Sequence, residues 1–101
     1  MAFRCVEFAS LEDLAEHVRR TLCDRQDLQP GEYPLRVIPL RTGGTEVGLL
    51  FVQHGPRMTQ LVAVWDHRCG AVHYYDCDGT RFLTEQARVV SPQPIDFSIA
   101  A

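Results

Sequence analysis

Lysine is absent from this sequence, and so is any long apolar run. All ten basic residues are arginine, and they are mixed along the chain with 13 acidic residues, which gives a formal charge of −3. This pattern lacks the basic patch of a nucleic-acid or membrane-surface binder, so we expect neither partner. We attribute the exclusive use of arginine to codon bias, although it would also suit bidentate anion recognition. No window approaches the roughly 18 uninterrupted apolar residues of a transmembrane helix.

Paired cysteine motifs are lacking too. Cys5, Cys23, Cys69 and Cys77 include no C-x-x-C pair, and the first residues contain no apolar run typical of a signal peptide. We therefore expect reduced thiols and a cytoplasmic location.

The sequence also lacks a recognisable metal or catalytic motif. His67, Cys69, His73 and Cys77 are zinc-ligand types. They fall in and between two turns at opposite ends of one strand, roughly 20 Å apart, so we expect no metal and no other cofactor. His67 and Cys69 beside Asp66 are the one local set for a Cys-His nucleophile, but a hairpin loop explains them more simply. We predict no catalytic residue, and the balance is against an enzyme.

What the chain does have is a long stretch of alternating apolar residues from Thr45 to Gln86, interrupted by turn signals at 43–44, 54–56 and 77–79. This pattern predicts a meander of antiparallel strands. At 101 residues, with 46% hydrophobic residues, the chain fits one domain, which we assign to residues 1–90, followed by a tail at 91–101.

One helix is expected ahead of the meander. Ser10 is a helix-capping residue, and an apolar stripe at i, i+3, i+4 and i+7 begins at Leu11 and predicts a helix to about Leu28. A short edge strand should precede it at residues 3–8, and an irregular edge strand containing Pro39 should follow it. The fold class is therefore α+β, with one N-terminal helix packed on a four- to five-stranded antiparallel meander. The order resembles that of cystatin-like domains, and the resemblance implies the layout alone.

Turn positions predict which side chains share a face of the sheet. We assume that Thr42 opposes Thr45, Gln53 opposes Met58, Asp66 opposes Ala71 and Asp76 opposes Arg81. One face then carries Ile38, Leu40, Val47, Leu49, Phe51, Val62, Val64, His73, Tyr75 and Phe82. The other carries Leu35, Val37, Gly48, Leu50, Val52, Leu61, Ala63, Trp65, Val72, Tyr74 and Leu83.

Both predicted faces are apolar, and a single helix covers only one of them. We expect the tail, with Ile95, Phe97 and Ile99, or a second copy of the chain to cover the other, and we favour a homodimer. The expected function is a non-catalytic self-associating or protein-binding module. The alternative is a small-ligand-binding domain or enzyme subunit with a pocket between helix and sheet. The candidate pocket or interface residues are Trp65, His73, Tyr74, Tyr75 and Phe97.

Overall fold

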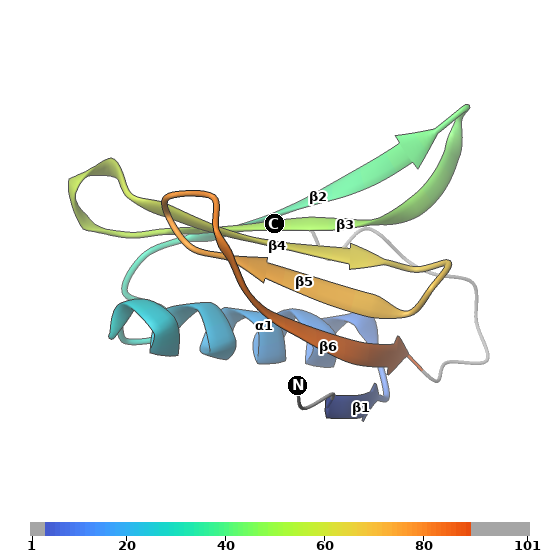
Figure 1. Ribbon diagram of the computed structural model, residues 1–101, viewed down its shortest axis with the longest axis horizontal. Helices are drawn as coiled ribbons and strands as arrows, with labels where there is room; N and C mark the ends of the chain where they lie inside the picture. The colour runs from blue at the N-terminus through green and yellow to red at the C-terminus, as the bar shows by residue number, and fades with distance from the viewer. Residues whose placement is uncertain (1–3, 90–101) are drawn as a thin grey trace.

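A single helix, α1 (Leu11–Gln26), lies against one face of a six-stranded mixed sheet in the computed structural model, which describes residues 4–89 (Figure 1). The strands are β1 (Arg4–Phe8), β2 (Leu35–Thr42), β3 (Thr45–His54), β4 (Gln60–Asp66), β5 (Ala71–Tyr75) and β6 (Arg81–Val89). A one-turn 3₁₀ helix, η1 (Pro56–Met58), connects β3 to β4. The predicted α+β layout is confirmed. The predicted tail lies outside the described residues.

The strand count was wrong: the sheet has six strands instead of four or five. Strands β2 to β6 form the expected antiparallel meander, in the spatial order β1-β6-β5-β4-β3-β2. The strand predicted at residues 3–8 joins this sheet as β1, which pairs in parallel with β6, from Arg4 beside Glu85 to Phe8 beside Val89. β1 thus lies at one edge of the sheet, beside the last strand β6. The helix α1 connects it to β2, which lies at the opposite edge.

The helix begins and ends as its sequence predicts. Ser10 adopts an extended backbone and its hydroxyl accepts a hydrogen bond from the Asp13 amide at 3.1 Å, which satisfies one of the unpaired donors of the first turn. Asp27 ends the helix in the left-handed region at φ 58°. The stripe that includes Leu14, Val18 and Leu22 is fully buried against the sheet.

Strand β3 faces the opposite way from its prediction. Thr42 does oppose Thr45, but a bulge between Leu40 and Arg41 changes the register of the rest of the hairpin. A bulge adds one residue to one strand and so reverses the facing of the residues beyond it. The η1 turn has the same effect at the other end, where His54 opposes Gln60. Leu49 and Phe51 therefore face α1, whereas Leu50 and Val52 face away from it. The predicted facing holds for β2, β4 and β5.

Both predicted edge strands are confirmed. β2, which contains Pro39, forms one edge, and β1 forms the other. Proline at an edge removes a donor that a central strand would need. The edge is therefore a poor template for a further strand.

The last turn of α1 is tied to the β5–β6 turn by an ion pair. The Arg25 guanidinium donates hydrogen bonds to both carboxylate oxygens of Asp76, the shortest at 2.6 Å, and lies over the Phe82 ring at 4.6 Å from its centre. The hydrogen bonds from Arg25 lower the pKa of Asp76. This pair adds a pH-dependent contribution to the packing of α1 on the sheet.

Replacing Asp76 with asparagine should remove that contribution. The folded-state pKa lies below the unfolded value of about 3.9. The stabilisation by the ion pair is therefore present at neutral pH and is lost as the pH falls through the lowered folded pKa. Thermal melts of wild type and Asp76→Asn should differ at neutral pH and converge in acid. Arg25→Gln should behave like Asp76→Asn. A difference in melting temperature from wild type that persists unchanged in acid would show that the ion pair is not the source of the pH dependence.

Candidate functional site

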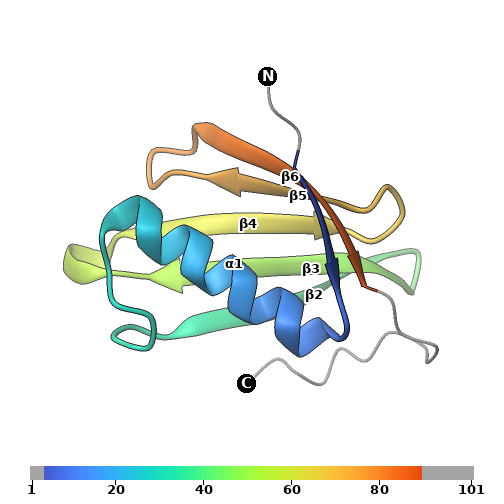
Figure 2. The ribbon, with the colours of Figure 1, turned by 90° about the horizontal axis from the view of Figure 1, so that it is seen from below.

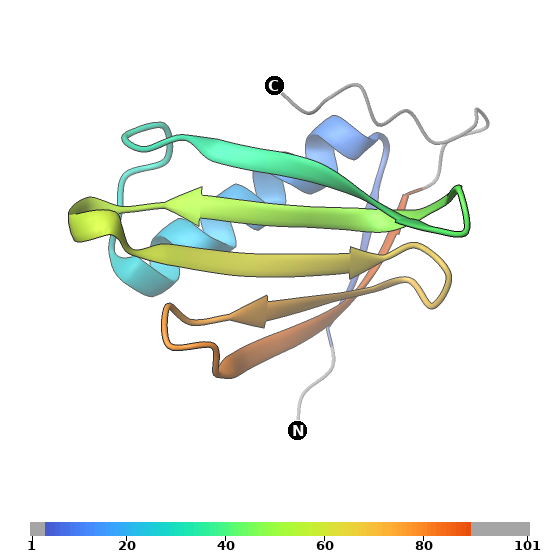
Figure 3. The ribbon, with the colours of Figure 1, turned by 90° about the horizontal axis from the view of Figure 1, so that it is seen from above.

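The face of the sheet that points away from α1 is the most distinctive surface of the molecule. No element of residues 4–89 lies over it (Figures 2 and 3). We call it the open face. Its central residues are apolar side chains from three neighbouring strands: Ile38 and Leu40 on β2, Leu50 and Val52 on β3, and Val62 and Val64 on β4. All but Val52 are half-buried, whereas Leu49 and Phe51 on the covered face are fully buried.

Polar side chains border this apolar centre. On β5, His73 lies beside Val64, and its Nδ1 is 3.1 Å from the Thr84 hydroxyl and 3.3 Å from the Arg81 guanidinium. Asp66 ends the β4 side, where its carboxylate accepts hydrogen bonds from the Arg68 amide and side chain. Although desolvation opposes the change, these hydrogen bonds lower the pKa of Asp66. An apolar centre with a polar border is the usual anatomy of a protein–protein interface.

A pocket of about 590 Å³ opens at one end of this face. It lies between the β3–β4 and β5–β6 turns and is lined by Met58, Thr59, Gln60, Val62, Tyr75, Asp76, Cys77 and Gly79. Arg57 and Met58 both adopt positive φ, at 58° and 62°, and Met58 is 94% exposed. Consecutive left-handed non-glycine residues are costly, and here they hold an apolar side chain in solvent at the border of the open face.

The structure divides the residues predicted as a pocket or interface between the two faces. His73 and Tyr75 are half-buried on the open face, and Tyr75 also lines the pocket. Trp65 and Tyr74 lie on the other side, buried under α1, where the Trp65 indole donates to the Ala87 carbonyl at 3.2 Å. Phe97 lies outside the described residues. The space between helix and sheet is thus occupied by the large side chains that were candidates for lining a pocket there.

A buried carboxylate lies beneath the helix. Glu85 is 1% exposed, and one of its oxygens accepts from the Tyr74 hydroxyl at 2.7 Å and lies 2.9 Å from His17 Nε2. His17 therefore turns from α1 toward the sheet. The alternation of residues along β6 could have predicted that Glu85 is buried, because it falls between Leu83 and Ala87 in the apolar phase of the strand. The His17 side chain is 24% exposed, whereas the Glu85 carboxylate and Tyr74 are buried beneath it.

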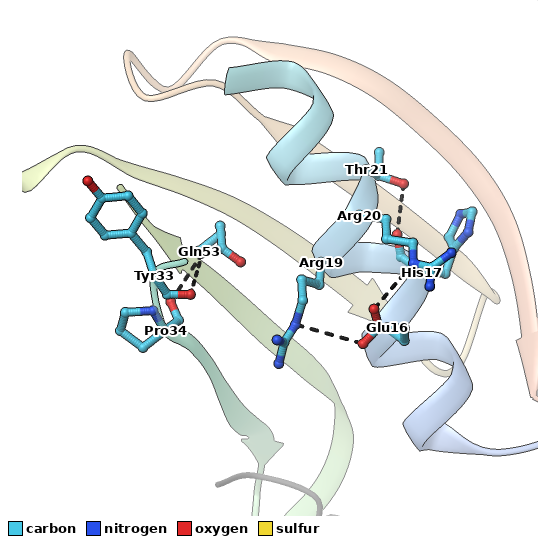
Figure 4. Close-up of polar contacts among 8 residues, drawn as sticks. All are labelled: Glu16, His17, Arg19, Arg20, Thr21, Tyr33, Pro34 and Gln53. Atoms are coloured by element: carbon cyan, nitrogen blue, oxygen red, sulfur yellow. Dashed lines mark hydrogen bonds and ion pairs between the residues drawn. The ribbon is translucent and has the colours of Figure 1, made fainter. Parts of the chain in front are cut away.

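A second buried polar group, Gln53, fastens the loop after α1 to the sheet. Its amide nitrogen donates to the carbonyl oxygens of Tyr33 and Pro34 at 3.1 and 3.3 Å (Figure 4). It also donates to the His54 carbonyl at 2.9 Å. Gln53 also follows Leu49 and Phe51 in the buried phase of β3. It is a structural anchor of the covered face.

Comparison with known proteins gives no match: no family model, no curated protein and no solved structure resembles this chain at a significant level. In the described part, no helix has the length and apolar character to span a bilayer. Within residues 4–89, no group of three or more His, Cys, Asp or Glu side chains could hold a metal ion. The site must therefore be interpreted from its own geometry.

Proposed function

We propose that this domain is a non-catalytic protein-binding module that docks a partner protein on its open face. The observation that supports the proposal is the exposed sheet face itself, in which three adjacent strands present apolar side chains that no described element covers. A sheet with one solvated face normally alternates apolar with polar residues. Here the outward phase of β2, β3 and β4 is apolar as well. We further propose a cytoplasmic location, which suits free Cys23, Cys69 and Cys77.

The size of the face suits a modest interface. The apolar centre has two outward residues on each of three strands about 4.8 Å apart, which gives a patch on the order of 200 Å². The largest apolar patch of a monomeric protein is often functional. The polar border and the pocket beside Tyr75 extend it toward the roughly 800 Å² that each partner contributes to a standard interface. Exposed Met58 at the border belongs to a residue type enriched in such contacts.

The small-ligand alternative has weaker support. Trp65, Phe51 and Tyr74 fill the interface between helix and sheet, and the pocket at the end of the open face is wide and formed largely by turn residues. Ligand pockets usually enclose most of the ligand's surface. Melting the protein with a metabolite panel at fixed protein concentration would support this alternative if one compound raised the transition temperature.

Charge placed in the centre of the open face should abolish partner binding while leaving the fold intact. We predict this for Leu50→Asp, because the carboxylate would be desolvated in the complex yet remains half-solvated in the free domain. The partner, once recovered with the full-length chain and identified, is purified and titrated calorimetrically against wild type and variant. We expect at least an order of magnitude weaker binding, equivalent to about 1.4 kcal/mol or more.

Thr21→Asp is the matched control on the helix side. Thr21 is half-buried, and its hydroxyl donates to the His17 carbonyl at 2.9 Å, away from the open face (Figure 4). This variant should bind normally once its fold is verified by circular dichroism. Equal binding by wild type and Leu50→Asp would refute the proposal. Sedimentation of the full chain and of a truncation after Val90 tests the other two occupants, a second copy and the tail.

A further inference from the structure

The arginines of this protein fall into two groups. Five of those with described side chains pair with carboxylates: Arg19 and Arg20 with Glu16, Arg25 with Asp76, Arg41 with Glu46 and Arg68 with Asp66. Figure 4 shows the first two pairs on the outer side of α1. The other four, Arg36, Arg57, Arg81 and Arg88, make no ion pair with any residue in the described range.

All four arginines without ion pairs lie at the border of the open face. Arg36 projects beside Val52 from the β2 edge, and Arg81 projects beside Tyr75 from β6, where it reaches His73. Arg88 alternates with buried Ala87 and therefore points to the open side of β6. Arg57 is in the η1 turn next to the pocket. The apolar centre is thus surrounded by guanidinium groups that are exposed and available.

Carboxylates do not balance these arginines. The open side carries Glu7, which is in register with Arg88 but makes no ion pair with it in the described structure, and Asp66, which is engaged by Arg68. At the pocket, Asp76 is engaged by Arg25, and exposed Asp78 makes no ion pair with a described residue. Two carboxylates without ion pairs thus face four such arginines. The acidic excess of the chain lies elsewhere. Exposed Glu12, Asp13, Glu16, Asp24, Asp27 and Glu32 are on α1 and the loop that follows it. A protein with a formal charge of −3 therefore presents one face on which positive charge prevails.

We infer that the open face takes a partner protein whose apolar contact residues are bordered by carboxylates. This inference rests on the proposed function and adds the chemistry of the partner. Guanidinium groups bind carboxylates in a planar, bidentate way and lose hydration easily, which is why arginine is common at interfaces. Complementary charge at the border fixes orientation and speeds association.

The same charges disfavour the other occupants. A second copy docked face to face would bring two arginine borders together with only Glu7, Asp66 and Asp78 on each to oppose them. The tail at 91–101 carries one acidic side chain, Asp96, which is too few for four arginines. Nucleic acid would place phosphates over an apolar centre whose six side chains are all aliphatic and offer no ring for stacking.

Three synthetic helical peptides test the inference. They share one apolar stripe and differ only at the stripe's borders, which are glutamate, glutamine or lysine. Against the full-length protein, measured by fluorescence anisotropy, the glutamate-bordered peptide should bind about tenfold or more tightly than the lysine-bordered one, with an advantage that declines as salt rises. The double variant Arg36→Glu/Arg81→Glu should reverse the preference. Arg20→Glu on the exposed side of α1 is the matched control and should retain it.

Each other outcome has a definite meaning. Equal binding of the three peptides that is lost in Leu50→Asp overturns the acidic partner but keeps the proposed binding face. If no peptide binds and the chain sediments as a dimer that Leu50→Asp disrupts, a second copy occupies the face and the inference is wrong. If no peptide binds to a monomeric chain, both proposals fall. Tighter binding of a single-stranded oligonucleotide than of the glutamate-bordered peptide, lost in the double variant, would also overturn the inference.

Discussion

Leu14→Ala should lower the free energy of unfolding by about 2 to 4 kcal/mol. Leu14 is fully buried in the middle of the α1 stripe and belongs to the same core cluster as Phe51 and Ala63. Replacing its isobutyl group with a methyl group loses the transfer free energy of three carbons and leaves a cavity that a helix anchored at both ends cannot close. Denaturant midpoints with an unchanged slope measure the loss.

Glu16→Ala is the control on the same helix. Glu16 is exposed and pairs with Arg19 and Arg20 on the solvent side, where such pairs contribute a few tenths of a kcal/mol. The denaturant midpoint of Glu16→Ala should therefore lie close to that of the wild type. Equal small losses in both variants would show that α1 does not dock through this stripe.

Gly48→Ala should destabilise the domain by an amount near the upper end of the roughly 1 to 3 kcal/mol typical of overpacking. Gly48 lies opposite Leu40 on β2, next to the bulged residue Val47, and opposite Asp66 on β4. A Cβ there would collide with the Trp65 carbonyl oxygen. Because the obstacle is backbone in the centre of the sheet, relief would require β3 and β4 to separate locally.

Gly79→Ala separates steric collision from backbone strain. Gly79 is in the β5–β6 turn at φ 86°, with open space around the position of a Cβ. The free energy of unfolding that Gly79→Ala loses should reflect the positive φ alone and amount to about 1 kcal/mol. Thermal and denaturant unfolding of both variants gives the comparison. A Gly48→Ala protein as stable as Gly79→Ala would mean that the β3–β4 contact is looser than described.

The elements of this fold could be predicted from sequence because their signals are local. Ser10 marks the start of the helix, and the alternation from Thr45 to Gln86 predicts the meander. The facing of β3 could not be predicted, because it depends on the bulge beside Arg41 and on the length of the turn that contains η1. One residue more or less in either place reverses every side chain on the strand.

The open face shows the same limit on prediction. The sequence was sufficient to expect a sheet that is apolar on both sides, and His73 and Tyr75 were assigned correctly to the side opposite Trp65 and Tyr74. The buried positions of Glu85 and Gln53 were missed, although each falls in an apolar strand phase. The arginine border could not be read from the sequence, because its members come from β2, η1 and β6. The four arginines without ion pairs can be recognised only in the tertiary fold, which pairs the other arginines with carboxylates.

The parallel pairing of β1 with β6 determines the order in which this chain can be completed during synthesis. Within this domain β1 leaves the ribosome before any other strand, but its partner strand ends at Val89. Contacts between segments so far apart in sequence form late, since loop closure must precede them. The β2–β3–β4 hairpins and α1 can form while β1 has no strand beside it. The nascent domain therefore has to keep its first strand from mispairing until almost all of its residues have emerged.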